Sequence, residues 1–271
     1  MGGIYLKKIL FIGAGNMASA SANGLAKAQI VENSSIILFD KNEEQYSKFN
    51  KDFSTVSDVN HGIEMADYIF ISVKPQNVKE VLSSINVSTD GKVFISICAG
   101  ITIESIANCI PNVKLVRAMP NTPLLIGQGV TAVCKNNNVT DTEFEFVKSI
   151  FSSCGIVTEI DEKDINALTA ITSSSPAYVY LFIKSMLDGA KNLNFNYVNT
   201  TELICKTIIG SANMILSSDK TPEEQIKMVK SPNGTTEKAL NVFENNNFEK
   251  IISDAMLACE KRAFELAELN K

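Results

Sequence analysis

The sequence has few of the residues that build metal centres and disulfide frameworks. Its 271 residues include a single histidine, His61, and six cysteines without a CxxC pair or a zinc-type spacing. No metal site is therefore expected, and each cysteine is interpreted as a small apolar side chain in a reducing compartment. The six are Cys98, Cys109, Cys134, Cys154, Cys205 and Cys259.

A long apolar run and a cluster of basic residues are also missing. No stretch reaches the roughly 18 apolar residues that a transmembrane helix needs. Acidic residues outnumber basic ones by 30 to 25, which argues against a nucleic-acid surface. The first residues do not follow the pattern of a secretory signal. The sequence thus predicts a cytoplasmic protein with no membrane partner and no nucleic-acid partner.

What is present predicts an α/β fold in the first part of the chain. Hydrophobic residues make up 45% of the sequence, enough for a sizeable core. Continuous apolar runs alternate with helical patterns, which is typical of βαβ units around a mostly parallel sheet. Strands are predicted at residues 9–12, 36–39, 68–71, 93–95, 115–119, 130–134 and 156–160. Helices are predicted at residues 17–28, 43–52 and 78–85.

The second part carries helix signals only. Ser175 before Pro176 predicts a capped helix start, and the spacings 199–202 and 221–224 are those of capping boxes. Residues 248–269 have apolar side chains at helical steps. The helix after Ser175 is apolar on nearly every side, which predicts that a second subunit covers it.

We therefore expect two domains. Residues 1–161 should form a Rossmann-type dinucleotide-binding domain with helices on both faces of the sheet. Residues 162–271 should form an all-helical dimerisation and substrate domain, joined to the first by a continuing helix around residues 161–171.

A glycine-rich turn follows the first predicted strand and opens a helix. Residues 13–18 (GAGNMA) have the GxGxxA form of a dinucleotide fingerprint. Gly13 would allow the tight turn, and Gly15 would let the backbone approach a pyrophosphate. The N–H groups at the helix start, around Asn16 and Met17, would face its phosphates. The context of strand, turn and helix predicts a nucleotide site.

The sequence does not decide between NADH and NADPH. Asp40 ends the second strand, where an acid binds the ribose hydroxyls of NAD and repels a 2′-phosphate. Lys41 and Asn42 follow directly, and they could hold that phosphate if Asp40 turned away. Both cofactors stay open at this point.

Further motifs in a fixed order point to one family. They are residues 72–76 (SVKPQ), 99–102 (AGIT), 117–123 (RAMPNTP), 175–178 (SPAY) and 231–236 (SPNGTT). From about Ile9 to Leu266 the chain resembles the pyrroline-5-carboxylate reductases. The pairing of MPNTP with SPxGTT is far more specific than the glycine turn.

The resemblance implies reduction of 1-pyrroline-5-carboxylate to L-proline by NADPH or NADH, the last step of proline biosynthesis. It also implies a homodimer with interleaved helical domains and, in part of the family, a decamer of five dimers. It further implies cofactor contacts from the segment Val73, Lys74 and Pro75, from Asn60 near the adenosine, and from the turn at Ala99. Lys74 could equally reach solvent.

Asn121 has two interpretations. Its amide can donate and accept at once, which suits the carboxamide of nicotinamide. The alternative is an Asx turn ahead of Pro123.

The substrate is expected at residues 231–236. The resemblance places its carboxylate near Ser231, Gly234 and Thr235, and the ring nitrogen beside Thr236, the catalytic hydrogen-bond partner. A helix start with free N–H groups favours a small anion, although a plain helix cap would look the same. The resemblance aligns Asp219 with an acidic residue that relatives bring to the substrate from the other subunit, which implies a catalytic role for it. Its neighbours Glu223 and Glu224 are alternatives, and capping already explains Glu224.

The chain departs from the family at Ser173, Ser175 and Asn233, where relatives commonly carry glycine. Two alternatives remain. Other imine or keto-acid reductases of this architecture need a lysine on the helix that crosses between domains, and residues 165–180 contain none. A non-catalytic NAD(P)-binding redox sensor would be expected to have lost the substrate-loop motif. In this chain that motif, at residues 231–236, is largely intact.

Overall fold

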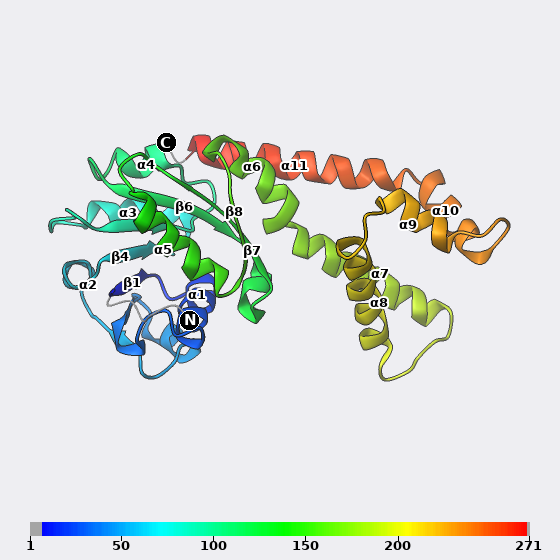
Figure 1. Ribbon diagram of the computed structural model, residues 1–271, viewed down its shortest axis with the longest axis horizontal. Helices are drawn as coiled ribbons and strands as arrows, with labels where there is room; N and C mark the ends of the chain where they lie inside the picture. The colour runs from blue at the N-terminus through cyan, green and yellow to red at the C-terminus, as the bar shows by residue number, and fades with distance from the viewer. Residues whose placement is uncertain (1–6, 270–271) are drawn as a thin grey trace. The chain divides into compact units, whose positions relative to one another are not determined.

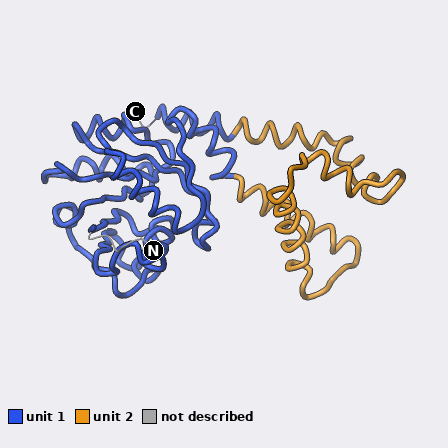
Figure 2. Tube along the Cα trace, viewed as in Figure 1, with its two compact units in different colours: residues 1–174, 259–271 blue, residues 175–258 orange. Residues whose placement is uncertain are grey.

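The computed structural model describes residues 7–269, in two compact units. The first unit comprises residues 1–174 and 259–271, and the second comprises residues 175–258 (Figure 2). The last helix, α11 (Phe248–Leu269), therefore contributes its first part to the second unit and its remainder to the first.

An eight-stranded sheet forms the centre of the first unit (Figure 1). The strand order is β3-β2-β1-β4-β5-β6-β7-β8, and every neighbouring pair is parallel except β6 and β7. The predicted mostly parallel sheet is confirmed. The strands are β1 (Ile9–Ile12), β2 (Ile36–Phe39), β3 (Ser54–Thr55), β4 (Tyr68–Ile71), β5 (Val93–Ser96), β6 (Lys114–Pro120), β7 (Gly129–Lys135) and β8 (Gly155–Glu159).

The connections reverse direction beside β1, because β2 lies on one side of it and β4 on the other. In open α/β sheets, ligands bind at the carboxyl ends of the strands at such a switch point. The glycine turn lies at the carboxyl end of β1, directly at this position.

Both faces of the sheet are covered, which explains the continuous apolar runs. Alternate side chains of β1 enter separate cores: Ile9 and Phe11 pack with α1 and α5, and Leu10 and Ile12 pack with α2, α3 and α4. The helices of the first unit are α1 (Asn16–Lys27), α2 (Val59–Met65), α3 (Val78–Ser83), α4 (Ile103–Ala107), α5 (Asp141–Ser152) and α6 (Ile165–Leu168).

One predicted helix is wrong in type and length. Residues 43–52 form a 3-10 helix only over Glu43–Lys48, which Asn42 caps. The buried rings of Phe49 and Phe53 then pack edge to face, so tertiary packing overrides the local helical pattern. The remaining 3-10 segments are Asn33–Ser35, Pro75–Asn77, Thr122–Ile126 and Glu162–Asp164.

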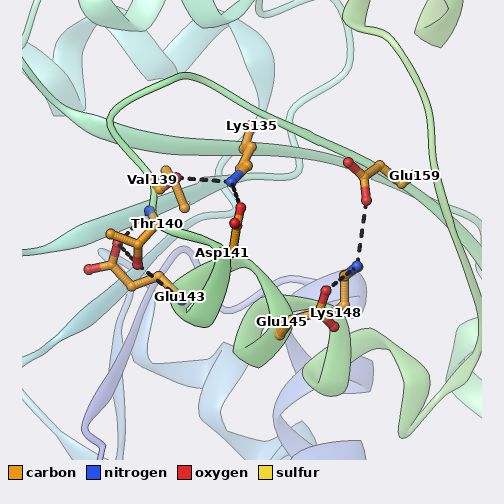
Figure 3. A network of polar contacts seen from close by, with 8 residues as sticks. All are labelled: Lys135, Val139, Thr140, Asp141, Glu143, Glu145, Lys148 and Glu159. Carbon is orange, nitrogen blue, oxygen red and sulfur yellow. Dashed lines mark hydrogen bonds and ion pairs between the residues drawn. The ribbon is translucent and has the colours of Figure 1, made fainter.

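Helix α5 begins with a complete capping box. The Thr140 hydroxyl accepts from the Glu143 N–H, and the Glu143 carboxylate accepts from the Thr140 N–H at 2.9 Å. The side chain of Lys135 binds the Val139 carbonyl and Asp141 on the same turn (Figure 3). Side chains of the chain itself therefore cap the start of this helix.

The chain is helical over residues 162–173 and again from Ser175 to Asn192, with a bend at Ser174 between the two segments. The helix predicted to begin at Ser175 is confirmed, with Ser175 as its first residue and not its N-cap. A π-helical segment, Thr169–Ser173, follows α6, and α7 (Ser175–Asn192) continues from it. Pro176 has no N–H and would crowd the preceding turn, so the wider π-helical turn before it accommodates the ring. The Ser174 N–H accordingly donates to the Thr169 carbonyl, five residues back.

The second unit is helical, as predicted. It contains α7, α8 (Thr200–Leu216), α9 (Pro222–Val229), α10 (Thr235–Asn245) and the first part of α11. Helix α7 has no buried residue, and Tyr180 and Leu181 are more than half exposed in the single chain. The predicted cap at Asn199 is wrong, because its side chain accepts no hydrogen bond from α8.

Neither unit offers a bilayer span or a metal cluster within residues 7–269. None of the helices in that range is both long enough and apolar enough to cross a membrane. The same residues contain no group of three or more His, Cys, Asp and Glu side chains placed to hold a metal ion.

Candidate functional site

Gly13 is required by a close approach of two backbones. Its φ is +97°, and a Cβ there would lie 2.8 Å from the backbone of Ser72 and Val73. The Ser72 hydroxyl donates to the carbonyls of Ile12 and Gly13, which ties the end of β4 to the turn. Any side chain at position 13 would push β1 and β4 apart.

Gly15 is free of such contacts, and its lack of a side chain has another effect. It is the N-cap of α1 and offers no side-chain cap to the N–H groups of the first turn. A Cβ at Gly15 would meet no atom of the described chain within 4 Å. The start of α1 is thus open to a group that approaches the backbone closely, and its N–H groups and helix dipole favour an anion. This fits the pyrophosphate of a dinucleotide.

The other members of the fingerprint behave as the pattern predicts. Ala18 is fully buried where α1 crosses the sheet, so a small residue is needed there. Asn16 is exposed and Met17 is half-buried in the first turn of α1. Their N–H groups belong to the uncapped start of the helix.

Asp40 is connected to the glycine turn. One carboxylate oxygen accepts from the Ala14 N–H at 2.6 Å, and the other accepts from the Asn42 N–H at 2.9 Å. The Tyr46 hydroxyl accepts from the Asp40 N–H at 2.9 Å. Burial raises the pKa of Tyr46, with the Asp40 charge adding to the effect. The acid is therefore held in place beside the turn by backbone donors.

A hollow beside the glycine turn brings six of the predicted cofactor residues together. They are Gly13, Gly15, Asp40, Lys41, Val73 and Lys74. They come from the carboxyl ends of three neighbouring strands, β2, β1 and β4. This is the position and composition expected for the adenosine and pyrophosphate of a dinucleotide.

The hollow also contains a residue that the sequence did not mark. Glu80 of α3 lines it, and its carboxylate lies 2.6 Å from the Nζ of Lys41. Asn42, which the sequence offered as a phosphate partner, lines the same hollow. No local motif surrounds Glu80, so only its ion pair with Lys41, which follows β2, reveals it.

The amide of Asn60 lies outside that lining. Its Nδ2 donates to the Ser84 carbonyl, and its Oδ1 accepts from the Asn86 N–H. These bonds connect α2 to the segment after α3. Pro75 lines a different hollow, next to α4, and Ala99 is exposed in the turn after β5.

Both polar atoms of Asn121 are occupied by the chain. Its Oδ1 accepts from the Val130 N–H at 2.9 Å, and its Nδ2 donates to the Thr172 carbonyl at 3.1 Å. The side chain is 8% exposed. It does not form an Asx turn, because its oxygen bonds across to β7 and makes no side-chain cap for the 3-10 helix that follows.

Another buried polar group of this unit is structural. Arg117 is 4% exposed, and its guanidinium donates to Glu162 at 2.9 Å. The same carboxylate oxygen accepts from the Ile103 N–H at 2.7 Å.

Buried thiols of this unit have raised pKa values. Burial raises the pKa of Cys98 to about 12, and burial with the Glu162 charge raises the pKa of Cys134 to about 12. These thiols are inert at neutral pH.

His61 is a surface residue. Its ring lies 3.9 Å from Glu64 on the same helix, and both side chains are more than half exposed.

In the second unit, residues 231–234 form a tight turn into α10. The Gly234 N–H donates to the Ser231 carbonyl at 3.0 Å, and Asn233 has a φ of 56°. Proline second and a left-handed residue third are typical of a type II turn. Asparagine is tolerant of this conformation, so the departure from glycine at position 233 keeps the turn.

The start of α10 is uncapped like that of α1. Gly234 is the N-cap and has no side chain to offer, so the N–H groups of Thr235 and Thr236 face outward from the first turn. A Cβ at Gly234 would lie 2.3 Å from the Ser231 hydroxyl oxygen. The glycine thus lets the Ser231 hydroxyl come close to the helix start. The Gly234 N–H itself is taken by the turn.

Glu237 is a second residue at the candidate site that is not among those predicted from the sequence. Its carboxylate accepts from the Asn233 N–H at 2.8 Å and lies 3.5 Å from the Nζ of Lys230. The spacing of three residues from the N-cap could have revealed it, since a glutamate there commonly reaches back over the helix start.

The acidic residues before α9 differ in their contacts. Glu224 forms a complete capping box with Thr221. The pKa of the Glu223 carboxyl group is lowered by hydrogen bonds from the Glu223 N–H and from the Thr221 hydroxyl. Asp219 is exposed in the connection between α8 and α9, with no hydrogen bond or ion pair among the described residues.

Comparisons with known proteins agree with this geometry. A family model described as pyrroline-5-carboxylate reductase dimerisation matches residues 162–266, and one described as NADP oxidoreductase, coenzyme F420-dependent, matches residues 8–100. Pyrroline-5-carboxylate reductase from Pseudomonas aeruginosa is 36% identical, over 96% of this chain and 97% of its own. The enzyme from Haemophilus influenzae is 36% identical, over 97% and 98%.

A solved structure is similar over the same length. The crystal structure of Plasmodium falciparum pyrroline carboxylate reductase with NADP bound has a TM-score of 0.91 at 33% identity, and the match covers 98% of this chain and all of that one. The chain belongs to the pyrroline-5-carboxylate reductase family.

Proposed function

We propose, from this membership, that the protein reduces 1-pyrroline-5-carboxylate to L-proline with NADH or NADPH. The observation that carries the proposal is similarity to enzymes of that name over nearly the whole chain at up to 36% identity. The bound dinucleotide supplies the hydride that the imine carbon receives. The remaining requirements fall on this chain: to hold both molecules, to orient the ring and to favour its protonated form.

The cofactor is assigned to the hollow beside the glycine turn. The uncapped N–H groups of α1, including those of Asn16 and Met17, would hold the pyrophosphate. Asp40 and Lys41 would face the adenosine ribose. We retain Val73, Lys74, Pro75 and Ala99 as backbone contacts toward the nicotinamide half, on the strength of the family motifs.

Asn60 and Asn121 have a more indirect part in this assignment. Both amides are already bonded to backbone groups. We propose that Asn121 positions the MPNTP turn by joining it to β7 and to the π-helical segment. Asn60 would position α2 in the same manner.

The substrate carboxylate is assigned to the start of α10. Free N–H groups of Thr235 and Thr236, with the nearby Ser231 hydroxyl, form an anion site that needs no arginine. Gly234 contributes by its lack of a side chain. The Thr236 hydroxyl is the hydrogen-bond partner of the ring nitrogen in this proposal.

The charge on the ring nitrogen decides how much acid catalysis is needed. A protonated C=N already attracts hydride, so positioning is the main requirement, and it can contribute about 7–11 kcal/mol. A carboxylate near the ring favours the cation. We assign that role to Asp219 of a second copy, because Glu224 is committed to capping α9.

The chain works as a homo-oligomer, in agreement with the dimerisation region at residues 162–266. The exposed apolar side chains of α7 provide the surface that a second copy would cover. The decamer of five dimers, the boundary of the domains at residues 161 and 162, and the cytoplasmic location remain predictions.

The direct test is turnover by the purified protein. With 1-pyrroline-5-carboxylate present, absorbance at the reduced-nicotinamide band should fall with NADH or NADPH. Thr236→Ala should lower kcat by about 10- to 100-fold, because a hydrogen bond to the charged ring nitrogen is removed. Tight nucleotide binding without turnover for either cofactor would favour the redox-sensor alternative. Turnover of an open-chain keto acid in place of the cyclic imine would favour a different reductase.

A further inference from the structure

The hollow beside the glycine turn has a charge pattern that bears on the choice between NADH and NADPH. Backbone donors of Ala14 and Asn42 hold the carboxylate of Asp40 at its edge. Each carboxylate oxygen keeps a second lone pair, so Asp40 can still accept a hydrogen bond from a ribose hydroxyl. The same negative charge repels a phosphate at the 2′ position.

The cation next to Asp40 is already paired. The Nζ of Lys41 lies 2.6 Å from Oε1 of Glu80, which reaches it from α3. Both residues line the hollow. A 2′-phosphate would need Lys41 as its counter-charge, and Glu80 competes for that lysine while adding a second negative charge.

The hollow as a whole offers no surplus of positive charge. Its lining includes two carboxylates, Asp40 and Glu80, and two ammonium groups, Lys41 and Lys74. A site for the extra phosphate of NADPH would be expected to have an excess of cationic donors. The balance here suits the neutral 2′-hydroxyl of NADH.

We propose that this chain prefers NADH to NADPH and that Glu80 determines this specificity by keeping Lys41 from a 2′-phosphate. The inference rests on the proposed function only in assigning the dinucleotide to this hollow. It concerns a residue 39 positions from Lys41 in the sequence, which the topology alone brings to the site.

The expected effects differ in size. Asp40 stands at the ribose position itself, so wild-type protein should bind NADH at least about tenfold more tightly than NADPH. The side chains of Lys41 and Glu80 are 71% and 67% exposed, and exposed ion pairs contribute little. Glu80→Gln should therefore move the ratio of the two Kd values toward NADPH by about threefold.

The test is direct binding, which does not depend on turnover. Full-length protein is titrated with NADH and with NADPH, without substrate, and the fluorescence of the bound cofactor gives each Kd. The measured quantity is the ratio of the two Kd values for wild type, Glu80→Gln, Lys41→Gln and the double variant. Glu80→Gln should lose its effect on the ratio when Lys41 is already glutamine, because the two act as a pair.

Glu43→Gln is the matched control. Glu43 is an exposed acid near the same loop but outside the lining of the hollow. Glu43→Gln removes the same charge as Glu80→Gln and should leave the ratio of the two Kd values unchanged. Equal shifts from Glu43→Gln and Glu80→Gln would overturn the role of Glu80. Wild-type protein that binds NADPH as tightly as NADH would overturn the preference.

The two proposals fail separately. Protein that reduces 1-pyrroline-5-carboxylate but binds NADPH more tightly refutes this inference and leaves the function intact. Protein that binds NADH selectively but reduces no cyclic imine supports this inference and refutes the function.

Discussion

Helices α1 and α10 begin differently from helices α5 and α9. The first two have glycine at the N-cap, Gly15 and Gly234, and neither receives a side-chain cap. The other two have complete capping boxes, Thr140 with Glu143 (Figure 3) and Thr221 with Glu224. Each compact unit therefore contains one helix of each kind.

The difference lies in the N–H groups of the first helical turn. In α5 and α9 a side chain of the chain accepts from them, and in α1 and α10 they stay available to a ligand. A capping side chain occupies N–H groups of the first turn and contributes about 1 kcal/mol to stability. A glycine leaves those N–H groups open and brings no side chain between them and an approaching anion. The two helix starts with glycine at the N-cap, at Gly15 and Gly234, are those assigned to the pyrophosphate and to the substrate carboxylate.

The largest effect is expected when the start of α1 is converted into a capped one. Gly15→Ser places a Cβ where no chain atom lies within 4 Å, so the fold should accept it. The serine would cap the first turn and stand where the pyrophosphate approaches. Affinity for NADH should fall by about 100-fold, equivalent to about 2.7 kcal/mol, while Tm stays the same or rises. Titration and thermal unfolding measure the two effects.

Gly13→Ala provides the contrast within the same turn. Its φ of +97° and the 2.8 Å approach to the Ser72 backbone leave no room for a Cβ. This variant should lose about 2–3 kcal/mol of stability. If Gly15→Ser were destabilised to the same extent, or if it kept its affinity for NADH, the distinction between the two glycines would be wrong.

The second prediction concerns the start of α10. Gly234→Ala introduces a Cβ 2.3 Å from the Ser231 hydroxyl oxygen, at a φ of −80° that alanine accepts. The serine must move, and the KM for 1-pyrroline-5-carboxylate should rise by about tenfold. Steady-state kinetics at saturating cofactor measure this change.

Thr221→Ala is the matched control in the same unit. It removes the capping box of α9 and should lower stability by about 1 kcal/mol without raising KM. An equal rise of KM in both variants would mean that Gly234 acts through general loosening of the helices.

The third prediction removes the cap of α5. Thr140→Ala takes away the hydroxyl that accepts from the Glu143 N–H. The free energy of unfolding should fall by about 1 kcal/mol, which lowers Tm by about 2–4 °C for a chain of this size. The Kd for NADH should stay at the wild-type value. A change in cofactor affinity would show that the α5 start is not purely structural.

The fold could be predicted from the sequence wherever one physical requirement dominates. Strands covered on both faces, such as β1 and β4, are fully apolar and show it locally. The prediction fails where packing between distant segments decides the local structure. Phe49 and Phe53 pack together in the interior and shorten the helix at residue 43, and a π-helical segment, Thr169–Ser173, precedes the helix that begins at Ser175.

The same distinction, between local motifs and packing of distant segments, applies to the candidate site. The glycine turn could be predicted because its chemistry lies within six consecutive residues. Glu80 could not, because its partner Lys41 lies on another element. Asn121 has the right chemistry for a cofactor amide, but its groups bond to Val130 and to Thr172, and no local pattern indicates those partners.

The smallest expected effect is the pH dependence of the α5 cap. Burial raises the pKa of Glu143, but hydrogen bonds from Lys114 and from Thr140 together outweigh it, so the pKa lies below its ordinary value of 4.5. A carboxyl group whose pKa is lowered by folding stabilises the protein fully above its unfolded pKa. That contribution is lost as the pH falls below 4.5 through the folded value.

Glu143→Gln should therefore be less stable than wild type at pH 7, by at most about 1 kcal/mol because solvent screens the partly exposed pair. The difference should shrink as the pH falls below 4.5. Denaturant unfolding at a series of pH values measures it. Asp141→Asn is the control on the same turn, since its side chain is 98% exposed and should contribute little. A difference between wild type and Glu143→Gln that stayed constant down to acid pH would mean that the Thr140 hydroxyl caps α5 without help from the carboxylate charge.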